Sequence, residues 1–302
     1  MVENNLVVLV LATVALGLLV PATGVALRGA VTPLLALLML VVSLTFDLAT
    51  LRDVLRRPWL QVLATLLVYV PMSLLALGLA ALLFREGDLW VGMVLLGTLP
   101  TDVSSPLLVW IARGNVALAT VFNAVNTALA PLLVPALFVL YTGVELNAPM
   151  ASLAGELAVV VLLPTAVGVA IRTWRPAPVA RIEPALSATG SLAYLALLLA
   201  VVGPNAGLIL AAPATVALVA AAALALNVGG YLVAAATGPL LRTRSDRVAM
   251  LFTVSKKEFS IAAFVVFAGG LPADVALPAV VYAVVQMLTS PAVARVLARR
   301  AD

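Results

Sequence analysis

The sequence predicts an all-α integral membrane protein with ten transmembrane helices, arranged as two inverted five-helix repeats. The first observation behind this prediction is composition: 64% of the 302 residues are hydrophobic, 10% are charged, and the mean hydropathy is +1.21. A soluble domain has too little interior to hide so much apolar surface, whereas a bilayer accepts it. The second observation is the distribution of arginine along the chain, and the third is a pair of polar interruptions at matching places in the two halves.

Ten apolar segments are long enough to cross a bilayer, which takes roughly 20 residues of helix. Charged residues and Gly/Pro clusters separate them, and the sequence VGPNAG (202–207) ends the seventh without a charged loop. The first segment follows an acidic residue and no basic one, so we interpret it as a retained helix and not as a cleaved signal peptide. The predicted helices are 5–24, 30–49, 58–84, 89–111, 116–142, 152–172, 187–204, 211–238, 246–270 and 274–297.

Arginine is concentrated on one side of the predicted membrane. With a cytoplasmic N-terminus, thirteen arginines fall in cytoplasmic loops or at the C-terminus, and only Arg28 and Arg85 fall on the other side. Cytoplasmic loops are enriched in Lys and Arg. We therefore expect a multi-pass protein of the cell inner (plasma) membrane with both termini cytoplasmic. The dispersed arginines would face lipid headgroups, so membrane lipid is an expected partner and nucleic acid is not.

The sequence also excludes several kinds of chemistry. It contains no cysteine and no histidine, which rules out disulfides, thiol nucleophiles, a Ser-His-Asp triad and zinc sites built on those residues. Neither lysine follows a glycine, so the phosphate-binding motif GxxxxGK[ST] is missing. We expect a protein that is not an enzyme, needs no cofactor and does not pump with ATP.

Polar residues interrupt the fourth and the ninth predicted helix at matching positions. The two sequences are LLGTLPTDVSSPLLVW (95–110) and MLFTVSKKEFSIAAFV (250–265). Pro100 and Pro106 each remove a backbone donor from the fourth helix, whereas only charge interrupts the ninth. We expect both helices to be unwound there, with their free backbone groups satisfied by protein or water.

The two halves match beyond these interruptions. In each following helix an amide precedes a proline by five residues, as Asn126 precedes Pro131 and Gln286 precedes Pro291. Because five is an odd number, the second half would enter the membrane in the opposite orientation, as in the inverted repeats of many secondary transporters. The predicted repeats are residues 1–145 and 146–302.

The interruptions place four charged residues, Asp102, Lys256, Lys257 and Glu258, near the middle of the membrane. Each would cost about 2.5–3.5 kcal/mol there if unpaired. We predict that Lys257 pairs with Asp102, and that Lys256, pointing about 100° away on a helix, faces a solute cavity. The alternative is a purely structural ion cluster, although buried ion pairs stabilise proteins poorly.

Neutral polar side chains complete the candidate site. Asn123 and Thr127 lie four residues apart on one face of the fifth helix. Their amide and hydroxyl groups suit an alkali cation or a solute carboxylate, and the alternative is hydrogen bonding between packed helices. The candidate substrate- or ion-binding residues are Thr101, Asp102, Ser104, Ser105, Asn123, Asn126, Thr127, Thr253, Ser255, Lys256, Lys257, Glu258, Ser260 and Gln286.

The chain resembles the bile acid:sodium symporter family and its superfamily, which includes arsenite permeases. Residues 37–58, 97–135 and 250–265 carry the resemblance. It implies a core domain and a panel domain, both termini inside, and unwound fourth and ninth helices that cross. It also implies transport of bile acids, other organic anions or vitamin precursors, usually with sodium. The arsenite permeases use a cysteine of the fourth helix, which this chain lacks.

The chain departs from the family's sodium-binding residues. Thr253 stands at the family's Glu position and Lys257 at its Gln position, while Ser105 is kept and Pro106 replaces an Asn. An ammonium group placed where sodium would sit argues against sodium as the coupling ion. Uniport and proton coupling through a buried Lys–carboxylate pair are the alternatives.

We therefore predict a secondary active transporter of a small organic, anionic solute. Its cavity would lie beside the crossing of the fourth and ninth helices, and one bundle would move against the other in alternating access. The alternative function is that of a non-transporting membrane sensor or scaffold, in which the charged cluster is structural.

Overall fold

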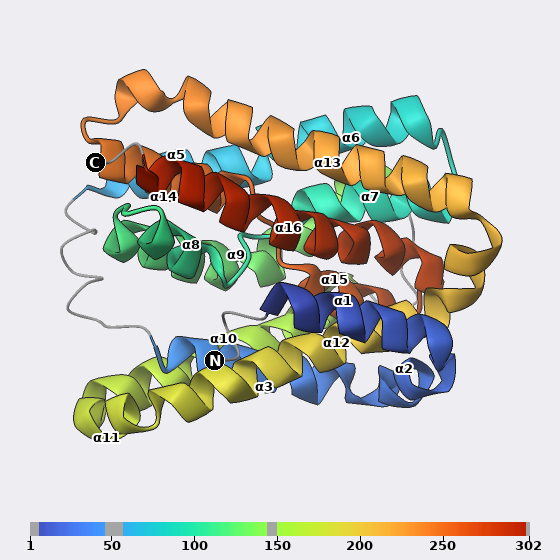
Figure 1. Cartoon of the computed structure of the whole chain (residues 1–302), viewed down its shortest axis with the longest axis horizontal. Coiled ribbons are helices and arrows are strands. Elements are labelled where there is room, and N and C mark those ends of the chain that lie inside the picture. The colour runs from blue at the N-terminus through green and yellow to red at the C-terminus, as the bar shows by residue number, and fades with distance from the viewer. Residues whose placement is uncertain (1–5, 46–56, 144–149, 300–302) are drawn as a thin grey trace.

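Every regular element within residues 6–45, 57–143 and 150–299, the part of the chain that the computed structural model describes, is a helix (Figure 1). Seven of these helical segments are long and apolar enough to cross a membrane. The predicted all-α membrane class is therefore confirmed. The seven segments are Pro21–Ser43, Pro58–Leu83, Val116–Thr142, Ala151–Trp174, Glu183–Ala211, Pro213–Leu240 and Ala273–Arg299.

Prolines decide where several helices begin. A proline has no N–H to donate and fits the first turn of a helix, where no donor is needed. The first predicted helix, 5–24, ends too late, because Pro21 starts a new helix that continues through a 3-10 turn to Ser43. Residues 46–49 of the second predicted helix lie outside the described residues. The elements up to Leu83 are α1 (Leu6–Leu19), α2 (Pro21–Leu27), α3 (Val31–Ser43), α5 (Pro58–Tyr69) and α6 (Pro71–Leu83).

The long helices of the remaining chain follow their predicted ranges closely, with one exception. The elements are α9 (Val116–Thr142), α10 (Met150–Trp174), α11 (Pro176–Arg181), α12 (Glu183–Ala211), α13 (Pro213–Ala236) and α16 (Leu277–Arg299). The exception is the seventh predicted helix, 187–204, because α12 continues through VGPNAG to Ala211. Gly203 does not form a turn there but allows α12 to pack closely on α2, because a Cβ at Gly203 would lie only 2.7 Å from the Cα of Gly24.

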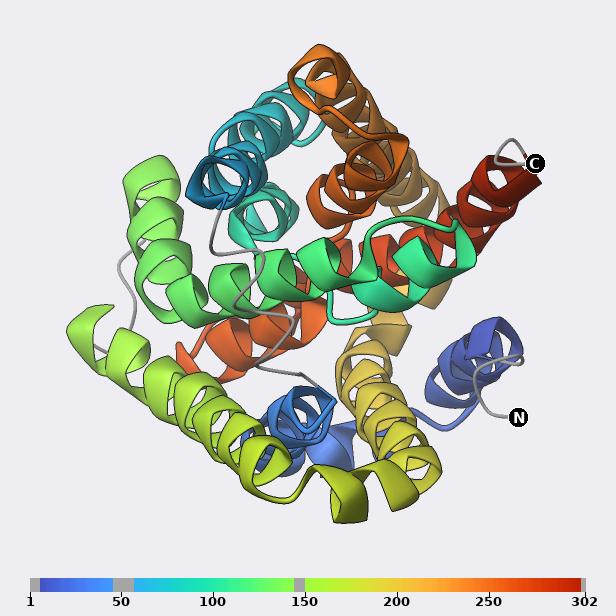
Figure 2. The same cartoon turned by 90° about the vertical axis from the view of Figure 1, so that its left-hand side faces the viewer.

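The helices pack in two groups. The small group contains α1, α2, α3, α10 and α12, and the large group contains the helices from α5 to α9 and from α13 to α16. Figure 2, in which the small group lies below the large one, shows this division end-on. Close backbone approach through Gly24 and Gly203 fastens α2 to α12 within the small group.

Two helical pairs in the large group are interrupted by non-helical backbone. They are α7 (Asp88–Thr98) with α8 (Ser105–Ile111), and α14 (Arg244–Val254) with α15 (Phe259–Ala268). Both interruptions fall where polar residues predict them. We call residues 99–104 the first break and residues 255–258 the second break.

The two breaks lie directly against each other. The backbone N–H of Glu258 donates to the carbonyl oxygen of Pro100 at 3.0 Å. The hydroxyl groups of Thr101 and Ser105 donate to the carbonyl oxygens of Thr253 and Phe252 at 2.9 and 3.1 Å. In addition, α8 packs on α14 and α15 packs on α7. The polar residues of both halves therefore meet inside the large group.

Candidate functional site

Thirteen of the fourteen predicted site residues are buried, and Ser104 is partly exposed. They come from the two breaks, the adjoining helix ends, α9 and α16. The structure thus gathers residues that are far apart in the chain around the contact between the breaks. Which of them binds a solute or an ion stays a prediction.

Side chains from α13 and α16 satisfy the backbone of the second break. The amide of Asn227 and the hydroxyl of Tyr282 donate to the carbonyl oxygen of Ser255 at 2.8 and 2.6 Å. Gln286 accepts from the N–H of Lys257 at 3.0 Å and donates to its carbonyl oxygen at 3.1 Å. Free backbone groups inside a membrane need such partners. These bonds explain how a segment without proline or glycine stays unwound.

Asp102 forms an ion pair with Lys256, so the prediction that it pairs with Lys257 is wrong. The Nζ atom of Lys256 lies 3.1 Å from Oδ1 of Asp102, and both side chains are 0% exposed. The hydroxyl of Ser104 bridges the pair, donating to Asp102 Oδ1 and accepting from Lys256 Nζ. The prediction assumed helical geometry, whereas residues 256–258 are not helical, so the helical spacing of about 100° between successive side chains does not apply.

Lys257 points away from the ion pair and binds backbone. Its Nζ atom donates to the carbonyl oxygens of Val68, Gly97 and Leu99 at 2.8, 2.9 and 2.8 Å. Val68 lies in the last turn of α5, and Gly97 and Leu99 lie at the end of α7. Carbonyl groups at helix C-termini lack intrahelical partners and carry partial negative charge. The ammonium group therefore holds two helix ends together without a carboxylate.

Glu258 caps the N-terminus of α15. Its Oε1 atom accepts from the backbone N–H and the hydroxyl of Ser260, and its Oε2 atom accepts from the N–H of Val103 at 3.0 Å. A carboxylate is favourable at a helix N-terminus, where N–H groups are free and the helix dipole is positive. Glu258 therefore ties the start of α15 to the first break.

The polar residues of α9 hydrogen-bond to the first break and to one another. The amide of Asn123 donates to the carbonyl oxygen of Asp102 at 3.1 Å, and the hydroxyl of Thr127 donates to Asn123 Oδ1 at 3.0 Å. The amide of Asn126 donates to the hydroxyl of Thr101 at 3.3 Å. In this structure α9 therefore supports the break through interhelical hydrogen bonds.

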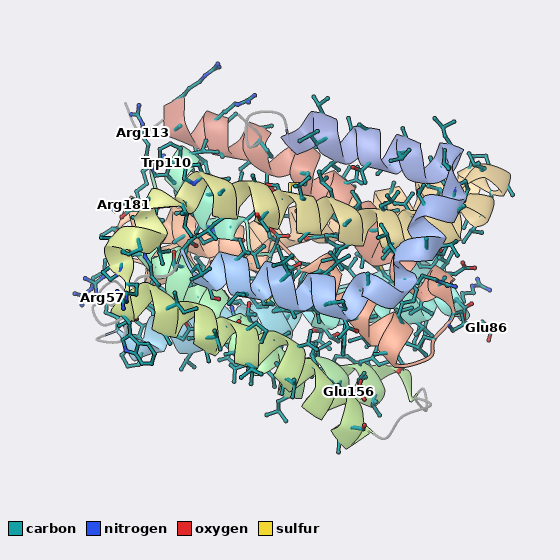
Figure 3. All side chains as sticks on the ribbon, turned by 90° about the horizontal axis from the view of Figure 1, so that it is seen from below. Arg57, Glu86, Trp110, Arg113, Glu156 and Arg181 are labelled. Atoms are coloured by element: carbon teal, nitrogen blue, oxygen red, sulfur yellow. The ribbon has the colours of Figure 1, made fainter. Side chains whose placement is uncertain are left out.

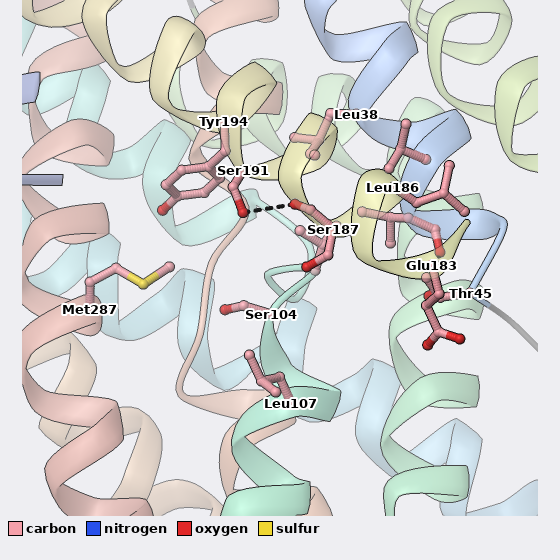
Figure 4. A pocket seen from close by; sticks show the side chains of 14 residues that line it. Leu38, Thr45, Ser104, Leu107, Glu183, Leu186, Ser187, Ser191, Tyr194 and Met287 are labelled. Carbon is pink, nitrogen blue, oxygen red and sulfur yellow. Dashed lines mark hydrogen bonds between the residues drawn. The ribbon is translucent and has the colours of Figure 1, made fainter. Parts of the chain in front are cut away.

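A cavity of about 230 Å³ adjoins the first break, between α3 and α12 of the small group and α16 of the large group (Figure 4). Its wall is mainly apolar, and its polar members are Thr45, Ser104, Glu183, Ser187, Ser191 and Tyr194. The cavity therefore meets the Asp102–Lys256 pair at Ser104.

The prediction missed the residues that α12 contributes to this cavity, three of which carry a hydroxyl group. Ser187, Ser191 and Tyr194 follow a spacing of four and then three residues, so they form a polar stripe along one face of the helix. That spacing is the feature of the sequence that could have identified these residues. Serine and tyrosine carry no charge, however, and are common within apolar helices.

This arrangement defines a class of protein: a multi-pass membrane protein whose unwound helices enclose buried charges beside a solute-sized cavity. The chain belongs to the Sodium Bile acid symporter family, whose family model matches residues 32–212. It is a family of transporters and not of enzymes, so the predicted resemblance and the transporter class are confirmed. The match includes the first break and ends before the second.

Three relatives illustrate the similarity. An uncharacterized sodium-dependent transporter, YocS, of Bacillus subtilis (strain 168) is 28% identical over 63% of this chain and 59% of its own length. The uncharacterized protein YbaS of the same organism is 28% identical over 79% of each chain. A probable sodium/metabolite cotransporter, the chloroplastic BASS2 of Oryza sativa subsp. japonica, is 32% identical over 47% of this chain and 34% of its own. The match with YocS thus covers less than two thirds of that relative.

Proposed function

We propose that the protein is a secondary active transporter of a small organic anion that works by alternating access. Its ten membrane segments would be the seven long helices, α1, and the interrupted pairs α7–α8 and α14–α15, arranged as inverted repeats of residues 1–145 and 146–302. The contact between the two breaks supports this arrangement, because each break lies in the fourth segment of its half. Movement of the small group against the large group would open the cavity to either side.

The cavity between the two groups is the proposed solute site. Apolar side chains of α3 and α12 would take the body of the solute, and the hydroxyl-bearing side near Ser104 would take its polar end. A mainly apolar pocket with a few placed polar groups is typical of small-molecule sites. The Asp102–Lys256 pair behind Ser104 would respond to the charge of the solute.

One observation carries the proposed coupling: the ammonium of Lys257 is held by three carbonyl oxygens. Converging carbonyl oxygens are typical ligands of an alkali cation. We propose that Lys257 is a tethered cation that takes the place of a bound sodium ion, so that transport is independent of sodium. Proton coupling is then supported by the Ser104-bridged Asp102–Lys256 pair, which lies beside the cavity and joins a proton donor to an acceptor.

Replacing sodium by potassium or choline should leave transport by the wild-type protein unchanged, because no sodium ion is needed where Lys257 lies. A thermal-shift screen of carboxylates, sulfonates and vitamin precursors first identifies the solute, and its uptake into proteoliposomes is then measured in each salt. An imposed pH gradient tests the proton separately. Steep stimulation by sodium would contradict the tethered-cation proposal.

The alternative, a non-transporting sensor or scaffold, is favoured by a different observation: Asp102, Lys256, Lys257 and Glu258 all have protein partners in the structure. A cluster that is satisfied internally needs no ligand. Uptake of any solute into proteoliposomes separates this alternative from a transporter.

The charge distribution supports an orientation in the cell inner (plasma) membrane with both termini cytoplasmic. Figure 3 places Arg57, Arg113 and Arg181 towards one end of the molecule and Glu86 at the other. Arginine marks the cytoplasmic side of a membrane protein. The end that carries these three arginines is therefore the proposed cytoplasmic end.

Single cysteines should react with a membrane-impermeant maleimide from opposite sides of the membrane. We expect Ala273→Cys to be labelled in intact cells and Thr243→Cys only after permeabilisation, because Thr243 lies beside the arginine-rich end. The chain has no cysteine of its own, so the unmodified protein is the background control. The reverse labelling pattern would overturn the orientation.

A further inference from the structure

Tyr194 occupies an unusual position between the cavity and the buried charges. Its ring forms part of the cavity wall and packs edge-on against Phe259 of α15, with ring centroids 4.8 Å apart. Tyr194 belongs to α12 of the small group, whereas Phe259 directly follows Glu258 in the large group. The side chain therefore bridges the two groups that the proposed function sets in relative motion.

The hydroxyl of Tyr194 is buried and has no hydrogen-bond partner among the described residues. The Gln286 amide and the Asp102 and Glu258 carboxylates lie near enough to this hydroxyl to act on it electrostatically. Leaving a buried hydroxyl unpaired is unfavourable, and such groups are rare in native structures. By contrast, the buried hydroxyls of Tyr69 and Tyr282 both donate to backbone carbonyl oxygens, at 2.7 and 2.6 Å.

We propose that Tyr194 is a positioning residue for alternating access, and that its hydroxyl gains a hydrogen bond to Asp102 or Gln286 in the state opposite to this one. Movement of α12 along the large group would carry the hydroxyl towards those acceptors. The bond would favour the opposite state, because a ligand or contact shifts an equilibrium only when it differs between the two states. Its ring meanwhile contacts whatever fills the cavity. Tyr194 thus links occupation of the cavity to the charge cluster.

The inference rests on the proposed alternating access, and its test needs no identified solute. Ser191 lines the cavity and is partly exposed, so Ser191→Cys reports access to the cavity. The labelling rate of this cysteine by an impermeant maleimide is measured from each side of the membrane in proteoliposomes. Tyr194→Phe removes one hydrogen bond from the state opposite to the one seen here. The labelling rate of the Ser191→Cys reporter from the side to which that opposite state opens should therefore fall about tenfold.

Tyr231→Phe is the matched control. The hydroxyl of Tyr231 donates to Ser290 Oγ at 2.9 Å, and both residues belong to the large group. This variant should leave labelling from both sides unchanged and lower the melting temperature. Tyr194→Phe should not lower the melting temperature, because it removes a hydroxyl that has no partner here.

The outcomes separate the inference from the proposed function. If Ser191→Cys reacts from only one side in the otherwise wild-type protein, alternating access through this cavity is wrong. If it reacts from both sides and Tyr194→Phe changes neither rate, the role of Tyr194 is wrong. A melting temperature of Tyr194→Phe as low as that of Tyr231→Phe would also overturn it, because the hydroxyl would then be bonded in the resting state.

Discussion

Lys256→Met should lower the free energy of unfolding by about 3–5 kcal/mol, because it leaves the Asp102 carboxylate buried without its cation. Asp102→Asn should cost a similar amount for the converse reason. The double variant should recover much of the loss, since no charge is left unpaired. Unfolding in detergent, followed by circular dichroism, measures all four proteins of this double-mutant cycle, and solute uptake is measured alongside.

The interpretation of the cycle depends on its coupling energy. Additive losses would show that Asp102 and Lys256 do not interact. An inactive but stable double variant supports a role for the pair in transport, whereas a fully active one would leave it as a structural link and favour the scaffold alternative. Arg57→Met is a surface control: Arg57 is 59% exposed in its pair with Asp246, so less than about 1 kcal/mol is expected.

Replacing Lys257 should be equally severe for a different reason. Lys257→Ala removes the ammonium group from the carbonyl oxygens of Val68 and Leu99, whereas Gly97 keeps its hydrogen bond from the Ser73 hydroxyl at 3.0 Å. The variant should lower the free energy of unfolding by about 2–6 kcal/mol, since each unpaired buried group costs about 1–3 kcal/mol. The truncation also leaves room for a small cation. Sodium or methylammonium should therefore raise the melting temperature of Lys257→Ala, with about 2.7 kcal/mol recovered at a hundred times the dissociation constant.

Two controls accompany this cation-rescue experiment. Choline is too large for the space left by one side chain and should not stabilise Lys257→Ala. Lys257→Met fills that space with an apolar chain and should be destabilised but not rescued. If sodium and methylammonium stabilise the wild type as much as Lys257→Ala, Lys257 does not occupy a cation site.

Composition and proline placement made much of the fold predictable. The predicted range 116–142 matches α9, because a long run without charged residues, flanked by Asn115 and Gly143, has clear limits. The first break was predictable from its two prolines around Asp102. The predicted end of α12 was wrong because of Gly203 and Pro204. Glycine and proline occur both in turns and where two helices pack closely, and only the position of the neighbouring helix shows which of the two applies.

That the charged residues of the two breaks lie close together was predictable, but their pairing was not. Charge at mid-membrane depth singled out Asp102, Lys256, Lys257 and Glu258. Which lysine meets Asp102 depends on the geometry of non-helical backbone, which side-chain spacing does not encode. The partners of Lys257 are carbonyl oxygens, which every residue possesses, so no sequence pattern identifies them.

The neutrality of the buried cluster has an electrical consequence. The formal charges of Asp102, Glu258, Lys256 and Lys257 cancel, and in the proposed transporter both cations would stay on the protein instead of crossing with the solute. The transmembrane potential would then act only on the solute and on any proton that crosses with it, at about 2.3 kcal/mol per charge per 100 mV. In a cell with a negative interior, a monoanion carried without a proton would be driven outward, whereas one carried with a proton would move without electrical work. A transporter whose cations are covalently part of the protein could thus not use the membrane potential to drive uptake of an anion.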